Sequence, residues 1–189
     1  MTKYESYTHV IRIDKEDCEG ILNNNNVSVT AKVDSTNSCV FFDGKEIQCG
    51  SRSRQLSETK DNAGFYHWVH SDNEEAQRLR DFCKNHENLI VYGEWCGIGA
   101  FLGTIKSYDR KALNHMYIFD VYDYADNRYL ADNEWRPMLA AYDLEEWFVQ
   151  LFGIFDHPTM EQIEEIAKNN KFLLENTDQI GEGVVVKAP

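Results

Sequence analysis

The sequence has few of the residues that mark fibrous or low-complexity chains, with 3 prolines and 11 glycines among 189 residues. It also lacks any run near the roughly 20 apolar residues that a membrane-spanning helix requires. Residues 1–17 are polar and charged, without the apolar segment of a secretory signal peptide. Since 42% of the residues are hydrophobic and 13% are aromatic, we expect a compact cytoplasmic domain that makes no membrane contact.

Cysteine and histidine occur without the spacings that bind metals or build disulfide frameworks. The five cysteines form no CxxC pair, so neither a disulfide scaffold nor a thiolate zinc site is indicated. His67 and His70 are three residues apart, but no further ligand stands nearby at a suitable spacing. We therefore expect reduced thiols, most of them buried.

Basic residues are the minority, with 19 lysines and arginines against 32 acidic residues and a formal net charge of −13. This balance excludes a protein that coats nucleic acid. The charge is uneven, because residues 1–110 carry a net −4 and residues 111–189 a net −9. Any surface that binds anions is expected in the first part, where Lys45, Arg52, Arg54 and Lys60 form the densest basic stretch.

Short β-like segments dominate the first half of the chain, and helical patterns are fewer. The predicted strands are 7–13, 27–33, 39–42, 89–95, 117–124 and 184–186. Apolar spacing predicts helices over 74–86 and 144–152, and a third that begins at Thr159 with a capping box completed by Gln162. Strands with separated helices, without regular βαβ alternation, predict an α+β domain with antiparallel β-sheets and flanking helices.

Four segments place ionisable or aromatic residues on or beside apolar strands. They are Lys32-Val33-Asp34-Ser35-Thr36-Asn37, Tyr92-Gly93-Glu94-Trp95, Ile118-Phe119-Asp120-Val121 and Glu182-Gly183-Val184-Val185-Val186-Lys187. Taken singly, each segment is ordinary, because exposed charged residues and buried aromatic residues occur in most domains. Their order and spacing make the set informative.

In this order, the four segments resemble the nucleotidyltransferase motifs of the covalent ligase and RNA-capping superfamily: KxDG, GE, an aromatic beside an acid, and EGvvvK. The chain is most similar to the RNA ligase family that seals nicked duplex RNA. Thr36-Asn37 follows the first motif, and Ser51-Arg52-Ser53-Arg54 stands about where that family has its next basic element. The resemblance extends from Ala31 to Lys187 and implies a nucleotidyltransferase (ATP-grasp-like ligase) fold.

The resemblance makes Lys32 the nucleophile. A neutral lysine amine can attack the α-phosphorus of ATP, giving a lysyl-AMP phosphoramidate and releasing pyrophosphate. Positioning and neutralisation of charge are then the main demands on the protein, and Mg²⁺ together with basic side chains meets them. The implied cofactors are therefore ATP and Mg²⁺.

The same resemblance assigns roles around the nucleotide. Glu94 accepts hydrogen bonds from the ribose hydroxyls, and Phe119 stacks on the adenine. Glu182 is catalytic and holds the metal ion, which prefers hard oxygen ligands. Lys187 either reaches a phosphate or caps its strand.

Further residues are implied to support the site. Asp34 and Asp120 are supporting acids. Asn37 and Arg52 contact a phosphate of the nucleotide or the nucleic-acid end, and Arg54 is the alternative to Arg52.

The chain departs from the family pattern at three places. Ser35 occupies the usual glycine position of the first motif, and Ala31 stands where these ligases usually carry glutamate. The sequence ends at Pro189 before the last motif of the superfamily, a strand with two lysines. We therefore expect residues 1–189 to be a single adenylyltransferase domain, truncated before that motif and before any C-terminal domain.

The predicted function is that of an ATP-dependent RNA ligase, which joins 5′-phosphate to 3′-hydroxyl ends of nicked or duplex RNA. One alternative is a DNA ligase or capping-enzyme nucleotidyltransferase core, which shares the four motifs. Another is a nucleotide-binding module with impaired catalysis, which Ser35 and Ala31 permit. The last is a β-rich domain whose motif matches are chance.

Overall fold

The computed structural model describes residues 1–99, 108–176 and 178–189. The chain forms two compact units. The first unit comprises Met1–Tyr7, Ser35–Thr104 and Ala112–Phe148, and the second comprises Thr8–Asp34, Ile105–Lys111 and Val149–Pro189.

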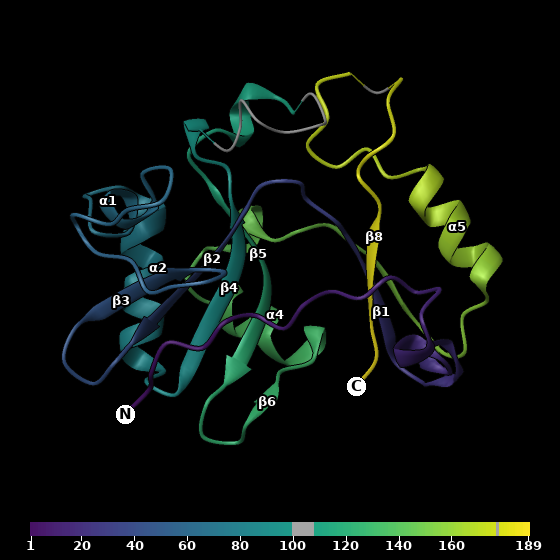
Figure 1. The fold of residues 1–189 in the computed structure, drawn as a ribbon, viewed down its shortest axis with the longest axis horizontal. Coiled ribbons are helices and arrows are strands. Elements are labelled where there is room, and N and C mark those ends of the chain that lie inside the picture. Colours follow the sequence, from purple (N-terminus) through teal and green to yellow (C-terminus); the bar gives the residue numbers. More distant parts are fainter. Residues whose placement is uncertain (100–107, 177) are drawn as a thin grey trace. The chain divides into compact units, whose positions relative to one another are not determined.

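The first unit is built on a five-stranded antiparallel sheet with the strand order β3-β2-β4-β5-β6 (Figure 1). The strands are β2 (Thr36–Phe42), β3 (Ile47–Ser51), β4 (Leu89–Trp95), β5 (Met116–Asp123) and β6 (Arg128–Tyr129). Asp43-Gly44 turns the chain between β2 and β3, and Gly44 has a φ of 92° that suits glycine. A register shift between Tyr92 and Gly93 marks a bulge in the pairing of β4 with β5.

Helices of the first unit pack on one face of this sheet. They are α1 (Phe65–Val69), α2 (Glu74–Asn85) and α4 (Asp132–Ala140), with a 3₁₀ turn at Glu145–Trp147. Asn73 caps α2 by accepting a hydrogen bond from the Ala76 backbone N–H at 3.1 Å. The apolar face of α2, formed by Ala76, Leu79, Phe82 and Cys83, is buried in one core with Val40 and Val91 of the sheet.

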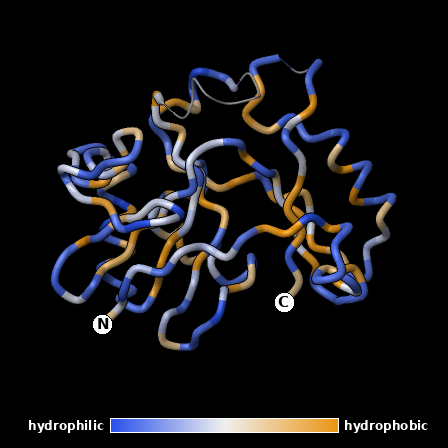
Figure 2. Tube along the Cα trace, in the orientation of Figure 1, coloured by the Kyte–Doolittle hydropathy of each residue, from blue (hydrophilic) through white to orange (hydrophobic). Residues whose placement is uncertain are grey.

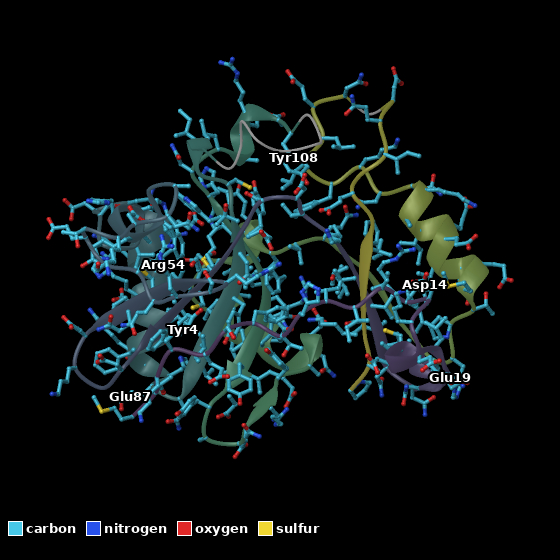
Figure 3. All side chains as sticks on the ribbon, in the orientation of Figure 1. Tyr4, Asp14, Glu19, Arg54, Glu87 and Tyr108 are labelled. Carbon is cyan, nitrogen blue, oxygen red and sulfur yellow. The ribbon has the colours of Figure 1, made fainter. Side chains whose placement is uncertain are left out.

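The opposite face of the sheet carries a smaller core in which most of the residues are aromatic. Phe41, Ile90 and Tyr92 are buried there, and Tyr4 and Tyr7 of the N-terminal segment pack against them. The predicted strand over residues 7–13 is wrong, because these residues form no strand. Side chains attach the segment instead: the Tyr4 hydroxyl donates to the Ser51 carbonyl at 2.7 Å (Tyr4 is labelled in Figure 3).

The second unit contains a three-stranded antiparallel sheet with the order β7-β1-β8. Its strands are β1 (Val27–Ala31), β7 (Leu151–Phe155) and β8 (Val184–Lys187), and its helix is α5 (Met160–Lys168). Figure 2 shows hydrophobic colouring along β1 and β8. Short 3₁₀ turns span Glu16–Cys18, Ile21–Asn23 and Arg110–Ala112.

Most of the predicted elements are confirmed, including α5 with its capping box between Thr159 and Gln162. The predicted helix over 144–152 is wrong. Its residues form a 3₁₀ turn and the start of β7, where Leu151 pairs with Thr30. A strand partner that is remote in sequence outweighs the local helical spacing. The strands β3, β6 and β7 and the helices α1 and α4 were not predicted.

Four of the five cysteines are buried as free thiols, as predicted. Burial raises the pKa of Cys49 and of Cys96 to about 12. In the described part of the chain, no helix has the length and apolar character needed to cross a membrane.

Candidate active site

Lys32 and Glu182 come together at the end of the β1–β8 ladder in the second unit. Ala31 pairs with Val184, and the Lys32 backbone N–H donates to the Gly183 carbonyl at 3.0 Å. The Lys32 Nζ forms an ion pair and hydrogen bond with Oε1 of Glu182. The two side chains are 39% and 24% exposed, so solvent reaches the pair. Residues 150 positions apart in sequence thus meet at one point.

The second carboxylate oxygen of Glu182 fits a role in holding a divalent cation. Glu182 Oε2 is buried and has no hydrogen-bond partner among the described residues. A buried carboxylate oxygen without a donor is costly, and a hard cation such as Mg²⁺ would satisfy it. Within the described ranges, no group of three or more His, Cys, Asp and Glu side chains is placed to bind a metal. Further ligands would therefore come from the nucleotide and from water, as is usual for Mg²⁺.

The chain after Lys32 is held at its backbone. The Asp34 N–H donates to the hydroxyl of Tyr108 at 2.7 Å. Tyr108 is buried and forms an antiparallel bridge with Leu174, and it is labelled in Figure 3. These contacts attach the segment that follows Lys32 to Tyr108.

Ser35, which replaces the usual glycine, is accommodated in the first unit. Its hydroxyl donates to the Trp95 carbonyl at 2.6 Å. Its backbone is not among the positive-φ positions, so the conformational freedom of glycine is not required here.

Asn37 and Glu94 form a polar row at one end of the five-stranded sheet. They are register partners on β2 and β4, and Glu94 also pairs with Tyr117 on β5. Directly paired residues of antiparallel strands present their side chains on the same face. Asn37 is buried and Glu94 is half-buried. A carboxylate that accepts and an amide that both donates and accepts can bind hydroxyl and phosphate groups.

Phe119 and Asp120 lie at the β4–β5 bulge, where both contact Tyr7. Phe119 is half-buried, and its ring lies 4.8 Å from that of Tyr7 in an edge-to-face arrangement. The Tyr7 hydroxyl donates to Asp120 Oδ2 at 2.8 Å, and Asp120 is only 2% exposed. Burial, together with the Asp120 carboxylate, raises the pKa of Tyr7 far above its usual value. Tyr7 therefore remains protonated, and it contacts both predicted site residues.

The three predicted basic residues each have different surroundings in the structure. Arg52 is exposed directly after Ser51, which pairs with Ser38, so it lies at the Asn37 end of the sheet. The Arg54 guanidinium donates to the Asp61 carbonyl at 3.3 Å. Lys187 pairs with Ser28, roughly 13 Å along the ladder from Lys32 at the usual rise per residue. The structure therefore does not bring the Lys187 backbone close to Lys32.

A family model described as RNA ligase matches residues 25–189, a range that includes all four motif-like segments. The chain belongs to the RNA ligase family. A search of curated proteins finds no match to this chain.

Solved structures of a Naegleria gruberi RNA ligase share the fold of this RNA ligase family member. The structure with PPi matches with a TM-score of 0.71 and 23% identity over 100% of this chain and 54% of that chain. A variant with ATP and Mn gives 0.71 and 20% over 99% and 54%, and a variant with AMP and Mn gives 0.64 and 23% over 88% and 47%. This chain thus spans about half the length of those proteins. Its antiparallel sheets and flanking helices match an RNA ligase nucleotidyltransferase domain.

Tyr7 and Tyr108 were not predicted as site residues, yet both bond to predicted site residues of this RNA ligase family chain. Both are tyrosines in polar surroundings with no motif around them. A buried tyrosine with a functional hydrogen bond cannot be distinguished in sequence from an ordinary core tyrosine. Only the partners of their hydroxyl groups, Asp120 and the Asp34 N–H, reveal their roles.

Proposed function

We propose that this chain is the adenylyltransferase domain of an ATP-dependent RNA ligase of the type that seals nicked duplex RNA. The observation that carries the proposal is the Lys32–Glu182 pair at the end of the β1–β8 ladder. The pair would supply a nucleophilic amine beside a carboxylate suited to a divalent cation. The membership of the RNA ligase family supports the choice of reaction.

The proposed reaction proceeds in three displacements at phosphorus. The Lys32 Nζ, after losing a proton to solvent, attacks the α-phosphorus of ATP, so that a P–N bond forms as the bond to pyrophosphate breaks. An oxygen of an RNA 5′-phosphate then attacks the same phosphorus and frees Lys32. A 3′-hydroxyl finally attacks the activated 5′-phosphate, which joins the ends and releases AMP. Mg²⁺ held with the help of Glu182 would neutralise the charge of the phosphates.

The remaining residues would bind and orient the nucleotide. Glu94 would accept hydrogen bonds from the ribose hydroxyls, and Phe119 would stack on adenine while Tyr7 holds its ring. Asn37 and Arg52 would contact phosphate or the RNA end.

Asp120 would act through its carboxylate, and Asp34 through its backbone N–H, which donates to Tyr108. Asp120 would anchor Tyr7 through its hydrogen bond, and Asp34 would help to orient the segment that follows Lys32. Lys187 would reach a phosphate only through its long side chain. The protein would act in the cytoplasm.

The test of adenylylation is incubation with α-labelled ATP and Mg²⁺, followed by denaturing electrophoresis. Label is expected on the parent chain and absent from Lys32→Ala. Lys168→Ala is the matched control, because Lys168 is an exposed lysine on α5, and it should label like the parent. Absence of label from the parent, also with GTP and with a chain extended past Pro189, would overturn the proposal. ATP binding without an adduct would then indicate a nucleotide-binding module.

The polynucleotide is identified by a sealing assay with the extended chain. Nicked duplexes of RNA, of DNA and of mixed strands carry a labelled 5′-phosphate at the nick. We expect joining to require RNA at the nick. Efficient sealing of all-DNA duplexes would contradict the choice of RNA and favour the DNA ligase alternative.

A further inference from the structure

Asn170 is a buried polar residue that no motif contains, and it lies just after α5 in the second unit. It is 1% exposed. Its side-chain Nδ2 donates to the Gly183 carbonyl at 2.7 Å, and its Oδ1 accepts from the Phe172 N–H at 3.0 Å. Its backbone carbonyl accepts from the Gly181 N–H at 2.8 Å. Asn170 therefore bonds to both neighbours of Glu182.

We call the bonds from Asn170 to Gly181 and Gly183 the clamp. The Gly183 carbonyl connects this clamp to Lys32. It accepts from Asn170 Nδ2 and also from the Lys32 N–H at 3.0 Å. One oxygen thus joins the backbone of Lys32, the backbone next to Glu182 and the side chain of Asn170. Loss of the Asn170 bond would loosen the strand start on which Glu182 depends.

The local sequence gives Glu182 little rigidity of its own. It stands between Gly181 and Gly183, and glycine has more backbone freedom than any other residue. Gly183 has a φ of 149°, which side-chain-bearing residues rarely adopt. A carboxylate in such a segment needs an external restraint to keep its direction. The bonds from Asn170 supply that restraint on both sides.

The packing at Gly181 indicates that the asparagine is built into this site. A Cβ at Gly181 would lie 2.6 Å from Asn170 Nδ2 and 2.8 Å from its Cγ. Position 181 must therefore lack a side chain if Asn170 is to reach Gly183. The asparagine side chain presents a donor group and an acceptor in a fork, and both groups are used here. Aspartate has the same shape but accepts only, so it would repel the Gly183 carbonyl.

We propose that Asn170 is a positioning residue that holds Glu182 against the Lys32 amine. The proposal rests on the proposed function of that pair, since it assigns Asn170 a role in adenylylation through Glu182. Asn170 does not touch the nucleotide in this account. Its effect on Lys32 should therefore disappear when Glu182 is changed.

The first experiment measures how fast an acylating reagent modifies Lys32, by mass spectrometry of the folded chain without ATP. In the parent, Glu182 forms an ion pair with the amine. Asn170→Asp should raise the rate at Lys32 by about threefold, which is the scale of a partly exposed ion pair. Glu182→Gln should raise it by a similar factor. The double variant should react no faster than Glu182→Gln, because both changes release the same contact.

A matched control makes the same chemical change one residue earlier. Asn169 is exposed, and among the described residues its side chain bonds within the last turn of α5, to the Glu165 carbonyl and Oε1. Asn169→Asp should leave acylation of Lys32 at the parent rate. Lys168 serves as an internal reference in every sample. A rise at both lysines would reveal general loosening, which overturns the positioning role.

Gly181→Ala provides a second route if Asn170→Asp fails to fold. The added methyl group would displace the Asn170 side chain without removing it. We again expect faster acylation of Lys32. When Gly181→Ala is combined with Glu182→Gln, the rate should not exceed that of Glu182→Gln alone. A parent-like rate in every folded clamp variant, or additive effects in the double variants, would overturn the proposal.

The second experiment links the clamp to catalysis. Asn170→Asp should slow lysyl-AMP formation at saturating ATP by about tenfold and change the apparent KM for ATP less than about twofold, because the contact serves the chemical step. If the parent chain forms no lysyl-AMP adduct, the proposed function is wrong. The acylation experiment, which uses no ATP, would still test whether Asn170 positions Glu182. A KM change alone would contradict the assigned role.

Discussion

Asn37 and Glu94 stand directly opposite each other on β2 and β4, where the register joins an amide and a carboxylate from segments 57 residues apart. Asn37 is buried beside Glu94, which is half-buried. Neither residue is close to the other in sequence, and only the antiparallel pairing makes them neighbours. The pair provides the polar end of a sheet face that is otherwise mostly apolar and aromatic.

Glu94→Gln should weaken ATP binding by about tenfold, because an amide replaces a charged acceptor for the ribose hydroxyls. Isothermal titration calorimetry measures the effect. Glu87→Gln is the control, since Glu87 is exposed just before the other end of β4. Equal affinities of the two variants would remove Glu94 from the nucleotide site.

Tyr7→Phe should lower the free energy of unfolding by about 1.5–3 kcal/mol, the usual range for a hydrogen bond to a charged group. Its hydroxyl donates to the buried carboxylate of Asp120. Tyr4→Phe is the matched comparison, because Tyr4 donates to the neutral Ser51 carbonyl, and it should cost about 1 kcal/mol. Urea denaturation measures both. A smaller loss for Tyr7→Phe than for Tyr4→Phe would contradict the account.

Glu75 gives the stability a defined dependence on pH. It is 7% exposed, accepts from His115 Nδ1 at 2.6 Å and accepts from the Met116 N–H at 3.2 Å. Burial raises the pKa of Glu75 above 4.5, although its hydrogen bond with His115 opposes the rise. The folded chain therefore binds this proton more tightly than the unfolded chain. That contribution to stability is fully present below about pH 4.5 and is lost as the pH rises through the raised value.

The stability of the parent relative to Glu75→Gln should therefore fall as the pH is raised from about 4.5 through the raised pKa of Glu75. Urea denaturation across this range measures the difference. Glu74→Gln is the control. Glu74 directly precedes Glu75 in α2, but it is exposed and forms an ion pair with Arg78. A relative stability that increases with pH would mean that the folded structure lowers the pKa of Glu75.

Gly183→Ala should destabilise the chain by about 1–3 kcal/mol, because alanine would be forced to a φ of 149°. It should also abolish most adenylylation, since Gly183 adjoins Glu182 and bonds to Lys32. Gly44→Ala tests strain alone, because Gly44 has a φ of 92° in the turn after β2. Thermal unfolding and AMP labelling separate the effects. Equal labelling of the two variants would show that Gly183 serves the fold only.

The elements predicted correctly are those whose signal is contained in a short stretch. The apolar face of α2 and the capping box of α5 are local patterns, and both formed as predicted. The segment from Leu144 to Phe152 has equally good helical spacing, yet Leu151 pairs with Thr30 in a strand. Its partner lies more than 100 residues away, so no local pattern reports the pairing.

The site shows the same division. Lys32, Glu94, Phe119 and Glu182 could be proposed from their motifs, because each stands beside an apolar strand with a recognisable order. Tyr7, Tyr108 and Asn170 bond to residues near three of these in sequence, and they carry no motif. Their roles follow from hydrogen bonds to Asp120, to the Asp34 N–H and to the Gly183 carbonyl.

The sequence by itself determined the alternation of its strands, the two well-formed helices and the order of the ligase-like motifs, because these depend on neighbouring residues. Only the tertiary structure decided which strands pair and in what register. That register sets Lys32 beside Glu182 and Asn37 beside Glu94. A shift of one residue would turn each side chain to the opposite face, so the chemistry of the site depends on long-range pairing that no short stretch of sequence contains.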